Sequence, residues 1–196
     1  ITVILLPTFY SLLGSKGTAT TITWSLKSEY NPLLIASKLF IGSFDFHEMQ
    51  KGYPNIFVGS LAMFSFLCYF KEKKIALSQR LYALFIAIVL LISFNIEMFD
   101  KLWHAGQLPN WYSYRFSFLF SFWMIFLGYQ WALKKTAVGI HETFVYFFLV
   151  LATSIGFILF PQDYLQGWQI ALGFGLSMGI LYGLILIGRG KRTHHK

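Results

Sequence analysis

Long apolar runs separated by short polar stretches constrain the fold of this chain more than any other feature of its sequence. A membrane-spanning helix needs roughly 20 predominantly apolar residues, with a range of about 17 to 25. The chain approaches or reaches this length repeatedly, which predicts an all-α, polytopic membrane helix bundle of about six spans. We expect spans at residues 1–13 (incomplete), 56–70, 81–96, 116–133, 144–160 and 168–188, all within one transmembrane domain covering residues 1–196.

The composition supports a membrane protein and excludes several other classes. Hydrophobic residues make up 56% of the chain and charged residues 12%, whereas an ordinary soluble domain carries about 25% charged residues. The net charge of +8 does not indicate a nucleic-acid partner, because the basic residues are dispersed between apolar runs and form no basic face. Cys68 is the single cysteine, so the chain can build neither a disulfide framework nor a cysteine metal site.

Basic residues predict how the chain is oriented in the membrane. If every run crosses once, three basic clusters lie on one side, and the positive-inside rule makes that side cytoplasmic. We therefore expect loops 15–55 and 97–115 outside, the C-terminus in the cytoplasm, and contact between the basic loops and anionic inner-leaflet lipids. The clusters are Lys71, Lys73, Lys74 and Arg80; Lys134 and Lys135; and Arg189, Lys191, Arg192 and Lys196.

The long first outer loop contains a short helix pattern over residues 32–41. Asn31 fits the N-cap and Pro32 the first helical position. The pattern is only partly amphipathic, and we expect this helix to lie along the outer membrane interface. The fold prediction is thus a helix bundle with a long outer loop that carries an interfacial helix.

Loop chemistry follows in residues 42–55, where two glycines and a proline bracket several ionisable groups. Asp45 and His47 are candidate site residues, since histidine titrates near neutrality and burial can tune a carboxylate. We interpret Glu48 and Lys51 as solvated loop residues. By the parity of the spans, this loop opens on the same side as residues 97–115.

The segment 103–118 places polar side chains among aromatics between two apolar runs. Charge close to hydrocarbon is costly, so ionisable groups at the edge of a span are candidates for a ligand site. Arg115 offers a planar donor fork suited to phosphate, at the point where the span 116–133 meets the outer leaflet. We expect Arg115 to contact a lipid phosphate, and the following residues to line a sugar or acceptor pocket: His104, Gln107, Asn110, Trp111 and Tyr112.

Simpler interpretations of these residues exist. Arg115 could be an interfacial arginine that extends its charge to water, and the Trp and Tyr residues could form an aromatic belt. A belt does not explain His, Gln, Asn and Arg together. Glu97 and Asp100 are interpreted as caps at the outer end of the span 81–96. No two-His helical spacing or acidic calcium loop is present, so we expect no metal.

At these residues the chain resembles the YfhO family of bacterial multi-span membrane proteins. The order and spacing of the matching pieces also fit, from about the first residue through at least the span 116–133. The pieces are Asn31-Pro-Leu, Lys38-Leu-Phe-Ile-Gly-Ser-Phe, Gly52-Tyr-Pro-Asn-Ile-Phe-Val-Gly59 and Trp103-His-Ala-Gly-Gln-Leu-Pro-Asn-Trp-Tyr-Ser-Tyr-Arg-Phe-Ser-Phe118.

The resemblance implies a GT-C-type glycosyltransferase of the bacterial cytoplasmic membrane. Such an enzyme takes a sugar from an undecaprenyl-phosphate carrier at the outer face, and family members are linked to teichoic acid glycosylation in Gram-positive bacteria. The implied partners are membrane lipids, the lipid-linked sugar and a cell-surface polymer acceptor, without a further cofactor. The resemblance also places the catalytic acidic residue in an earlier outer loop, so we expect this chain to be an internal fragment that is inactive alone.

Two other classes of protein stay open at this stage. A transporter or permease segment would carry charges or broken helices near the bilayer midplane. A non-catalytic membrane scaffold is supported by Gly175, Gly179 and Gly183, whose four-residue spacing predicts a smooth face for helix packing.

Overall fold

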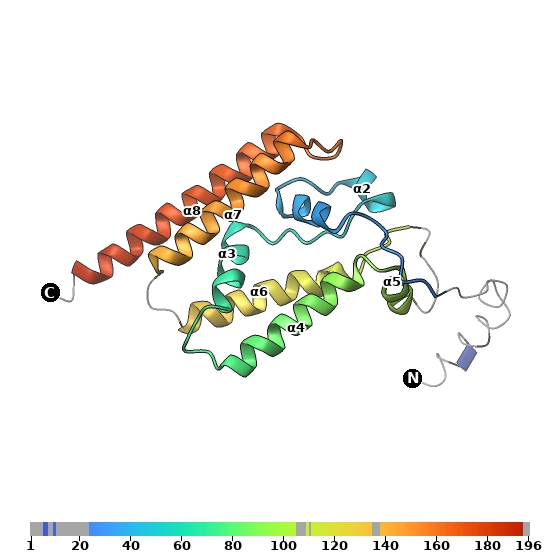
Figure 1. The fold of residues 1–196 in the computed structure, drawn as a ribbon, viewed down its shortest axis with the longest axis horizontal. Coiled ribbons are helices and arrows are strands. Elements are labelled where there is room, and N and C mark those ends of the chain that lie inside the picture. Colours follow the sequence, from blue (N-terminus) through green and yellow to red (C-terminus); the bar gives the residue numbers. More distant parts are fainter. Residues whose placement is uncertain are drawn as a thin grey trace.

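The computed structural model describes residues 6–7, 10, 24–104, 109, 111–134 and 138–193 (Figure 1). Regular structure in these residues is helical apart from two isolated β-bridges, which confirms the predicted all-α class. The elements are η2 (Pro32–Leu39), α2 (Phe46–Lys51), α3 (Ser60–Tyr69), α4 (Leu77–Ser93), α5 (Glu97–Trp103), α6 (Ser117–Lys134), α7 (Ile140–Leu159) and α8 (Gly167–Thr193).

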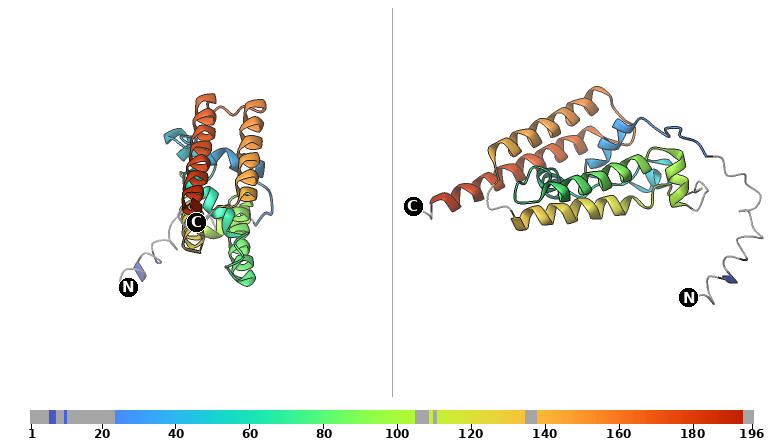
Figure 2. Two further views of the ribbon diagram at one scale, coloured as in Figure 1. Left: turned by 90° about the vertical axis from the view of Figure 1, so that its left-hand side faces the viewer. Right: turned by 60° about the horizontal axis from the view of Figure 1, so that its bottom comes forward.

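The long helices form two layers with α3 between them. Helices α7 and α8 run side by side as a hairpin, and α4 and α6 make up the second layer (Figure 2). Helix α3 contacts α6, α7 and α8, so it joins the layers. The core that it shares with them contains Phe64, Leu127 and Tyr146, all nearly inaccessible to solvent.

Two helices have the length and apolarity of a membrane span among the described residues. They are α7, over Ile140–Leu159 with a mean hydropathy of 1.9, and the Gly167–Ile187 part of α8, with a mean hydropathy of 2.2. Helix α4 is apolar but shorter, at 17 residues. Six crossings therefore stay a prediction, and residues 1–13 lie largely outside the described part of the chain.

The apolar run at 56–70 is helical only from Ser60 onward. Helix α3 has 10 residues, a length of about 15 Å at 1.5 Å per residue, which is half of the roughly 30 Å hydrocarbon core. It begins after Gly59, whose φ of +81° is a left-handed conformation that favours glycine. The residues before Gly59 have no regular structure, so this run does not form one continuous helix.

Close helix packing occurs at other glycines than the sequence predicts. A Cβ at Gly128 of α6 would lie 3.0 Å from the Ser65 Cβ of α3, and a Cβ at Gly173 of α8 would lie 2.9 Å from the ring of Phe40. At Gly175, Gly179 and Gly183 a Cβ would meet no described atom within 4 Å. The prediction that these three form a packing face is therefore wrong for contacts within the described chain.

Polar connections gather at the two ends of the bundle. The α3–α4 connection and the C-terminal end of α8 lie at one end, whereas η2, α2 and α5 lie toward the other (Figure 1). At the first end, Lys74 Nζ donates to the Lys134 carbonyl at 3.2 Å and thereby joins two of the basic clusters. The candidate site residues are at the opposite end.

Candidate functional site

The two loops that the sequence assigns to one side of the membrane contact each other. The Tyr112 backbone N–H donates to the Met49 carbonyl at 3.0 Å, and the rings of Trp111 and Phe46 lie 5.6 Å apart. Tyr112 has a φ of 53°, a strained conformation for a bulky residue, and this backbone bond holds it. Helix α2 and the turn at 111–116 therefore form one polar and aromatic end of the molecule.

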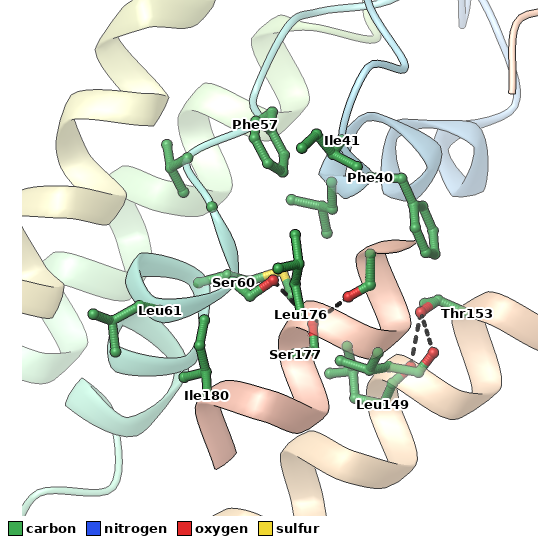
Figure 3. Close-up of a pocket in the computed structure, with 16 residues that line it drawn as sticks. Phe40, Ile41, Phe57, Ser60, Leu61, Leu149, Thr153, Leu176, Ser177 and Ile180 are labelled. Carbon is green, nitrogen blue, oxygen red and sulfur yellow. Dashed lines mark hydrogen bonds between the residues drawn. The ribbon is translucent and has the colours of Figure 1, made fainter. Parts of the chain in front are cut away.

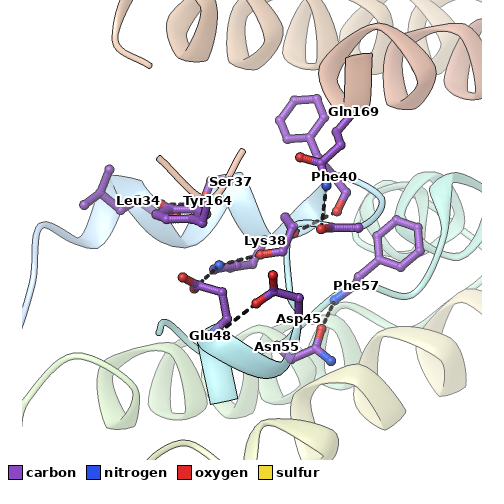
Figure 4. A network of polar contacts seen from close by, with 12 residues as sticks. Leu34, Ser37, Lys38, Phe40, Asp45, Glu48, Asn55, Phe57, Tyr164 and Gln169 are labelled. Carbon is purple, nitrogen blue, oxygen red and sulfur yellow. Dashed lines mark hydrogen bonds and ion pairs between the residues drawn. The ribbon is translucent and has the colours of Figure 1, made fainter. Parts of the chain in front are cut away.

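A first buried cluster, here the Lys38 cluster, consists of Lys38, Ser43, Glu48 and Tyr164. The Lys38 side chain is 0% exposed and forms an ion pair with Glu48. Its Nζ also donates to the Ser43 carbonyl at 2.6 Å and lies 3.7 Å from the centroid of the Tyr164 ring. Figure 4 shows Lys38 directed toward Glu48 between η2 and α2. The interpretation of Glu48 as a solvated loop residue is therefore wrong.

The Lys38 cluster fastens the outer loop to the α7–α8 hairpin. The Tyr164 hydroxyl lies 2.9 Å from Ser37 Oγ, and Gln169 Nε2 donates to the Gly42 carbonyl at 2.5 Å. Burial lowers the pKa of Lys38, and Glu48 opposes this by hydrogen bonding and charge. Because every polar group of this cluster that we describe has a partner, the cluster is structural in character.

Asp45 and His47 lie at the start of α2. Asp45 is its N-cap and accepts a hydrogen bond from the Glu48 backbone N–H at 3.0 Å, which lowers the pKa of Asp45. The His47 ring contacts the ring of Phe46 edge-on. Both side chains are exposed, so capping is the observed role of Asp45, and substrate binding by either residue stays a prediction.

A second cluster, here the Asp100 cluster, surrounds the buried side chain of Asp100. It consists of Glu29, Tyr30, Asp100, His104 and Tyr114, of which Glu29 is exposed. Backbone bonds from Glu29 N–H to Asn95 and from Glu97 N–H to Lys27 lay the segment 24–30 along the start of α5. This pairing brings Glu29 and Tyr30 toward Asp100. The Tyr114 hydroxyl donates to Glu29.

Several polar atoms in the Asp100 cluster have no hydrogen-bond partner. The Asp100 side chain is 1% exposed, and neither carboxyl oxygen accepts a hydrogen bond from the described residues. The same holds for the Tyr30 hydroxyl and for Nε2 of His104. Because buried polar groups are almost always paired in proteins, such exceptions require an explanation. Asp100 also lies in α5 beyond the end of α4, so the interpretation that it caps the span 81–96 is wrong.

Burial governs the titration of this cluster. It raises the pKa of Asp100 to about 7, and the charge of Glu29 adds to the effect. Burial also raises the pKa of Glu29, opposed by the hydrogen bond from Tyr114. For His104, burial lowers the pKa while its hydrogen bond to the Asp100 backbone raises it, and the charge of Arg115 lowers it further. Asp100 therefore changes its charge near neutral pH, as acid–base groups do.

A row of tyrosines connects the two clusters. The Tyr53 ring lies 5.5 Å from that of Tyr164 and 4.7 Å from that of Tyr30. Tyr30 in turn lies 5.9 Å from Tyr114. The clusters therefore belong to one continuous region at this end of the bundle.

Arg115 is exposed at the edge of this region. Its guanidinium donates to the carbonyls of Trp111 at 3.0 Å and Tyr112 at 3.4 Å. These bonds fix the side chain over the turn and leave its charge open to solvent. Gln107 and Asn110, the remaining predicted pocket residues, lie outside the described residues.

Sequence reasoning did not single out Lys38, Glu29 or Tyr30 as members of polar clusters. The contact between Asp100 and His104 could have been predicted, because residues four apart share one face of a helix. The approach of Glu29 to Asp100 could not, since it depends on backbone pairing between segments distant in sequence.

An apolar cavity of about 280 Å³ lies between η2, α3, α7 and α8. Its wall includes Phe40, Ile41, Phe57 and Leu176 (Figure 3). The Ser177 hydroxyl on the wall donates to the Gly173 carbonyl at 2.8 Å, and other hydroxyls there are bonded within the protein. A cavity of this character accommodates hydrocarbon.

The structure and the comparison with known families together define a helical bacterial membrane protein. The chain belongs to the YfhO family: the model of the bacterial membrane protein YfhO matches residues 1–195, which confirms the resemblance seen in the sequence. No curated protein and no solved structure matches the chain. Within the described residues, no group of three or more His, Cys, Asp or Glu side chains is placed to hold a metal ion.

Proposed function

We propose that this chain is part of a GT-C-type glycosyltransferase that transfers a sugar from undecaprenyl phosphate to a cell-surface polymer such as teichoic acid. The observation that carries the proposal is the Asp100 cluster, in which buried polar groups without partners lie beside the exposed Arg115. Unsatisfied donors and acceptors beside a fixed positive charge suit a ligand with hydroxyl and phosphate groups.

The proposed roles follow from the chemistry of each group. Arg115 contacts the phosphate of the carrier. Its positive charge stabilises the negative charge that develops on this phosphate as the bond to the sugar breaks. Trp111 offers a flat face to the sugar, and Tyr112, His104, Gln107 and Asn110 line the pocket with Asp45 and His47 on the opposite loop. The apolar cavity beside Phe40 holds part of the isoprenoid chain. In this proposal these loops face outward from the bacterial cytoplasmic membrane.

Replacing Arg115 tests the proposal most simply. In the full-length protein, expressed in a strain without the native copy, Arg115→Ala is expected to lower the sugar content of purified cell-surface polymer by at least 10-fold. A charge contact of this kind is worth roughly 1.5–3 kcal/mol. Lys51→Ala is the matched control, since Lys51 is an exposed cation on the facing loop. Normal sugar content in Arg115→Ala, with normal membrane insertion, would contradict the proposed site.

A transporter segment is the second candidate, and one observation favours it. The apolar run 56–70 contains a helix only over Ser60–Tyr69, preceded by irregular backbone. Interrupted helices line binding sites in many transporters. Vesicles containing the purified protein would discriminate: movement of a labelled lipid-linked sugar between leaflets, without transfer to polymer, supports this candidate over the transferase.

A further inference from the structure

The apolar cavity between η2, α3, α7 and α8 opens at the depth of the hydrocarbon core. The lining side chains that reach the surface are apolar: Phe57, Leu61 and Leu176 (Figure 3). Leu176 lies near the middle of the Gly167–Ile187 segment, which has the length and apolarity of a membrane span. The middle of such a segment lies in hydrocarbon. The mouth of the cavity is therefore continuous with the lipid-facing surface of α8, and a ligand enters from the bilayer.

Phe40 forms part of the cavity wall, and its position is fixed. Its backbone N–H donates to the Ser37 carbonyl at 3.2 Å, and its carbonyl accepts from Ser43 Oγ at 2.8 Å. The side chain is 5% exposed, and its ring lies 6.0 Å from the ring of Phe157 on α7. Hydrogen bonds thus hold the backbone on both sides, and α7 occupies the space behind the ring.

The ring of Phe40 fits against α8 because Gly173 has no side chain. A Cβ at this position would lie 2.9 Å from the ring, closer than the roughly 3.5–4.0 Å at which carbon atoms pack best. Helix α8 is held in place at this level, since Gln169 Nε2 donates to the Gly42 carbonyl at 2.5 Å. Because the side toward Phe157 is filled, a displaced ring moves into the empty cavity.

We propose that Gly173 and Phe40 are the specificity-determining pair of this cavity: together they keep it wide enough for a branched isoprenoid chain. The inference rests on the function proposed above and names the residues that select the chain of the lipid carrier. A side chain at position 173 pushes the Phe40 ring inward and narrows the cavity. An isoprenoid chain carries methyl branches and is wider than a straight chain, so narrowing excludes it first.

The size and chemistry of the cavity agree with this ligand. Its volume of about 280 Å³ equals that of about nine water molecules at roughly 30 Å³ each. Methyl and methylene groups are of similar size, so the cavity holds about two isoprene units. The hydroxyls of Ser60, Thr153 and Ser177 on its wall are bonded within the protein. Shape rather than hydrogen bonding therefore decides what the cavity accepts.

Photolabelling of the full-length protein in phosphatidylcholine nanodiscs tests the pair. The probe is farnesyl phosphate with a photoreactive diazirine on its terminal isoprene unit, and labelled peptides are identified by mass spectrometry. In the wild type we expect label in the cavity segments 149–153 and 173–180. Unlabelled farnesyl phosphate competes. Dodecyl phosphate, which has the same main-chain length without methyl branches, is expected to compete at least about 10-fold more weakly.

Gly173→Ala is expected to lower the label in these segments by about 10-fold or more, because one added carbon in an apolar pocket has an effect of this size. Gly175→Ala is the matched control. It makes the same change on the same helix, where a Cβ would meet nothing within 4 Å, and it keeps wild-type labelling. Adding Phe40→Leu to Gly173→Ala shortens the displaced side chain and is expected to restore the label, which misfolding would not allow.

Each alternative outcome has a distinct meaning. Wild-type labelling of Gly173→Ala would overturn the specificity role, as would an equal loss in Gly175→Ala or a failure of Phe40→Leu to restore the label. Equal competition by dodecyl phosphate would show that the cavity accepts any hydrocarbon chain, and would overturn selection of an isoprenoid. Labelling requires no sugar transfer. A wild-type protein that is labelled in the cavity but transfers no sugar to polymer would therefore refute the proposed function and leave the chain selection intact.

Discussion

The Lys38 cluster and the Asp100 cluster lie at the same end of the molecule and both bury charged side chains, but they differ in hydrogen bonding. Lys38 has an ion-pair partner, a carbonyl acceptor and an aromatic ring around its ammonium group. In the Asp100 cluster, the Asp100 carboxyl, the Tyr30 hydroxyl and His104 Nε2 have no hydrogen-bond partner. The comparison separates a buried ion pair that holds loops together from a group of buried polar atoms whose hydrogen-bonding capacity is unused.

Breaking the ion pair in the first cluster gives the largest expected effect. Lys38→Ala leaves Glu48 without its cation, and loss of one partner from a buried pair costs roughly 3–5 kcal/mol of unfolding free energy. The measurement is unfolding of the full-length protein in micelles by titration with a denaturing detergent.

The double replacement Lys38→Met with Glu48→Leu is the matched control. Replacing both partners by apolar residues of similar size is often neutral or stabilising, so the double variant is expected to be more stable than Lys38→Ala. A single variant as stable as the wild type would show that the pair does not hold these loops.

Replacing Asp100 is expected to raise the free energy of unfolding, whereas replacing Lys38 lowers it. Its folded-state pKa of about 7 lies above that of an unfolded aspartate, so its ionisation destabilises the fold as pH rises from about 4 to 7. At one pKa unit per 1.36 kcal/mol, Asp100→Asn is expected to gain roughly 2–4 kcal/mol above pH 7 and almost nothing near pH 4. Unfolding titrations of both proteins across this pH range measure the difference.

A gain that is the same at pH 4 and pH 8 would indicate a packing effect and would remove the electrostatic distinction between the clusters. Asp163→Asn serves as the control, because Asp163 is an exposed aspartate outside both clusters.

Two tyrosines give the smallest and most direct contrast. The buried Tyr30 hydroxyl has no partner, so Tyr30→Phe is expected to be neutral or to stabilise by up to about 1 kcal/mol. The Tyr164 hydroxyl pairs with Ser37, so Tyr164→Phe is expected to cost about 1 kcal/mol. The same micelle titration measures both variants, and equal effects would contradict the assignment of partners.

Much of the helical pattern could be predicted from the sequence. The N-cap at Asn31 and Pro32 at the first helical position are both present at η2, where the Asn31 side chain accepts a hydrogen bond from Leu33 N–H. The helices α7 and α8 begin and end within a few residues of the apolar runs 144–160 and 168–188, apart from a longer C-terminal end of α8. Hydropathy suffices there because each run is apolar over a full helix length.

The run 56–70 shows where hydropathy fails. Apolar residues occur throughout it, but the helix begins only at Ser60, after the left-handed φ of Gly59, and composition does not encode a backbone angle. The two polar clusters could not be predicted from the sequence for another reason. Lys38 and Tyr164 are far apart in the sequence, and their contact depends on how the outer loop packs against the α7–α8 hairpin.

The most direct test compares transfer by one variant from each cluster in the full-length protein. Sugar content of the cell-surface polymer is measured for His104→Gln and for Lys38→Met with Glu48→Leu, at matched amounts of inserted protein. The account predicts loss of sugar in the first and retention in the second. Retention in His104→Gln together with loss in the double variant would contradict it.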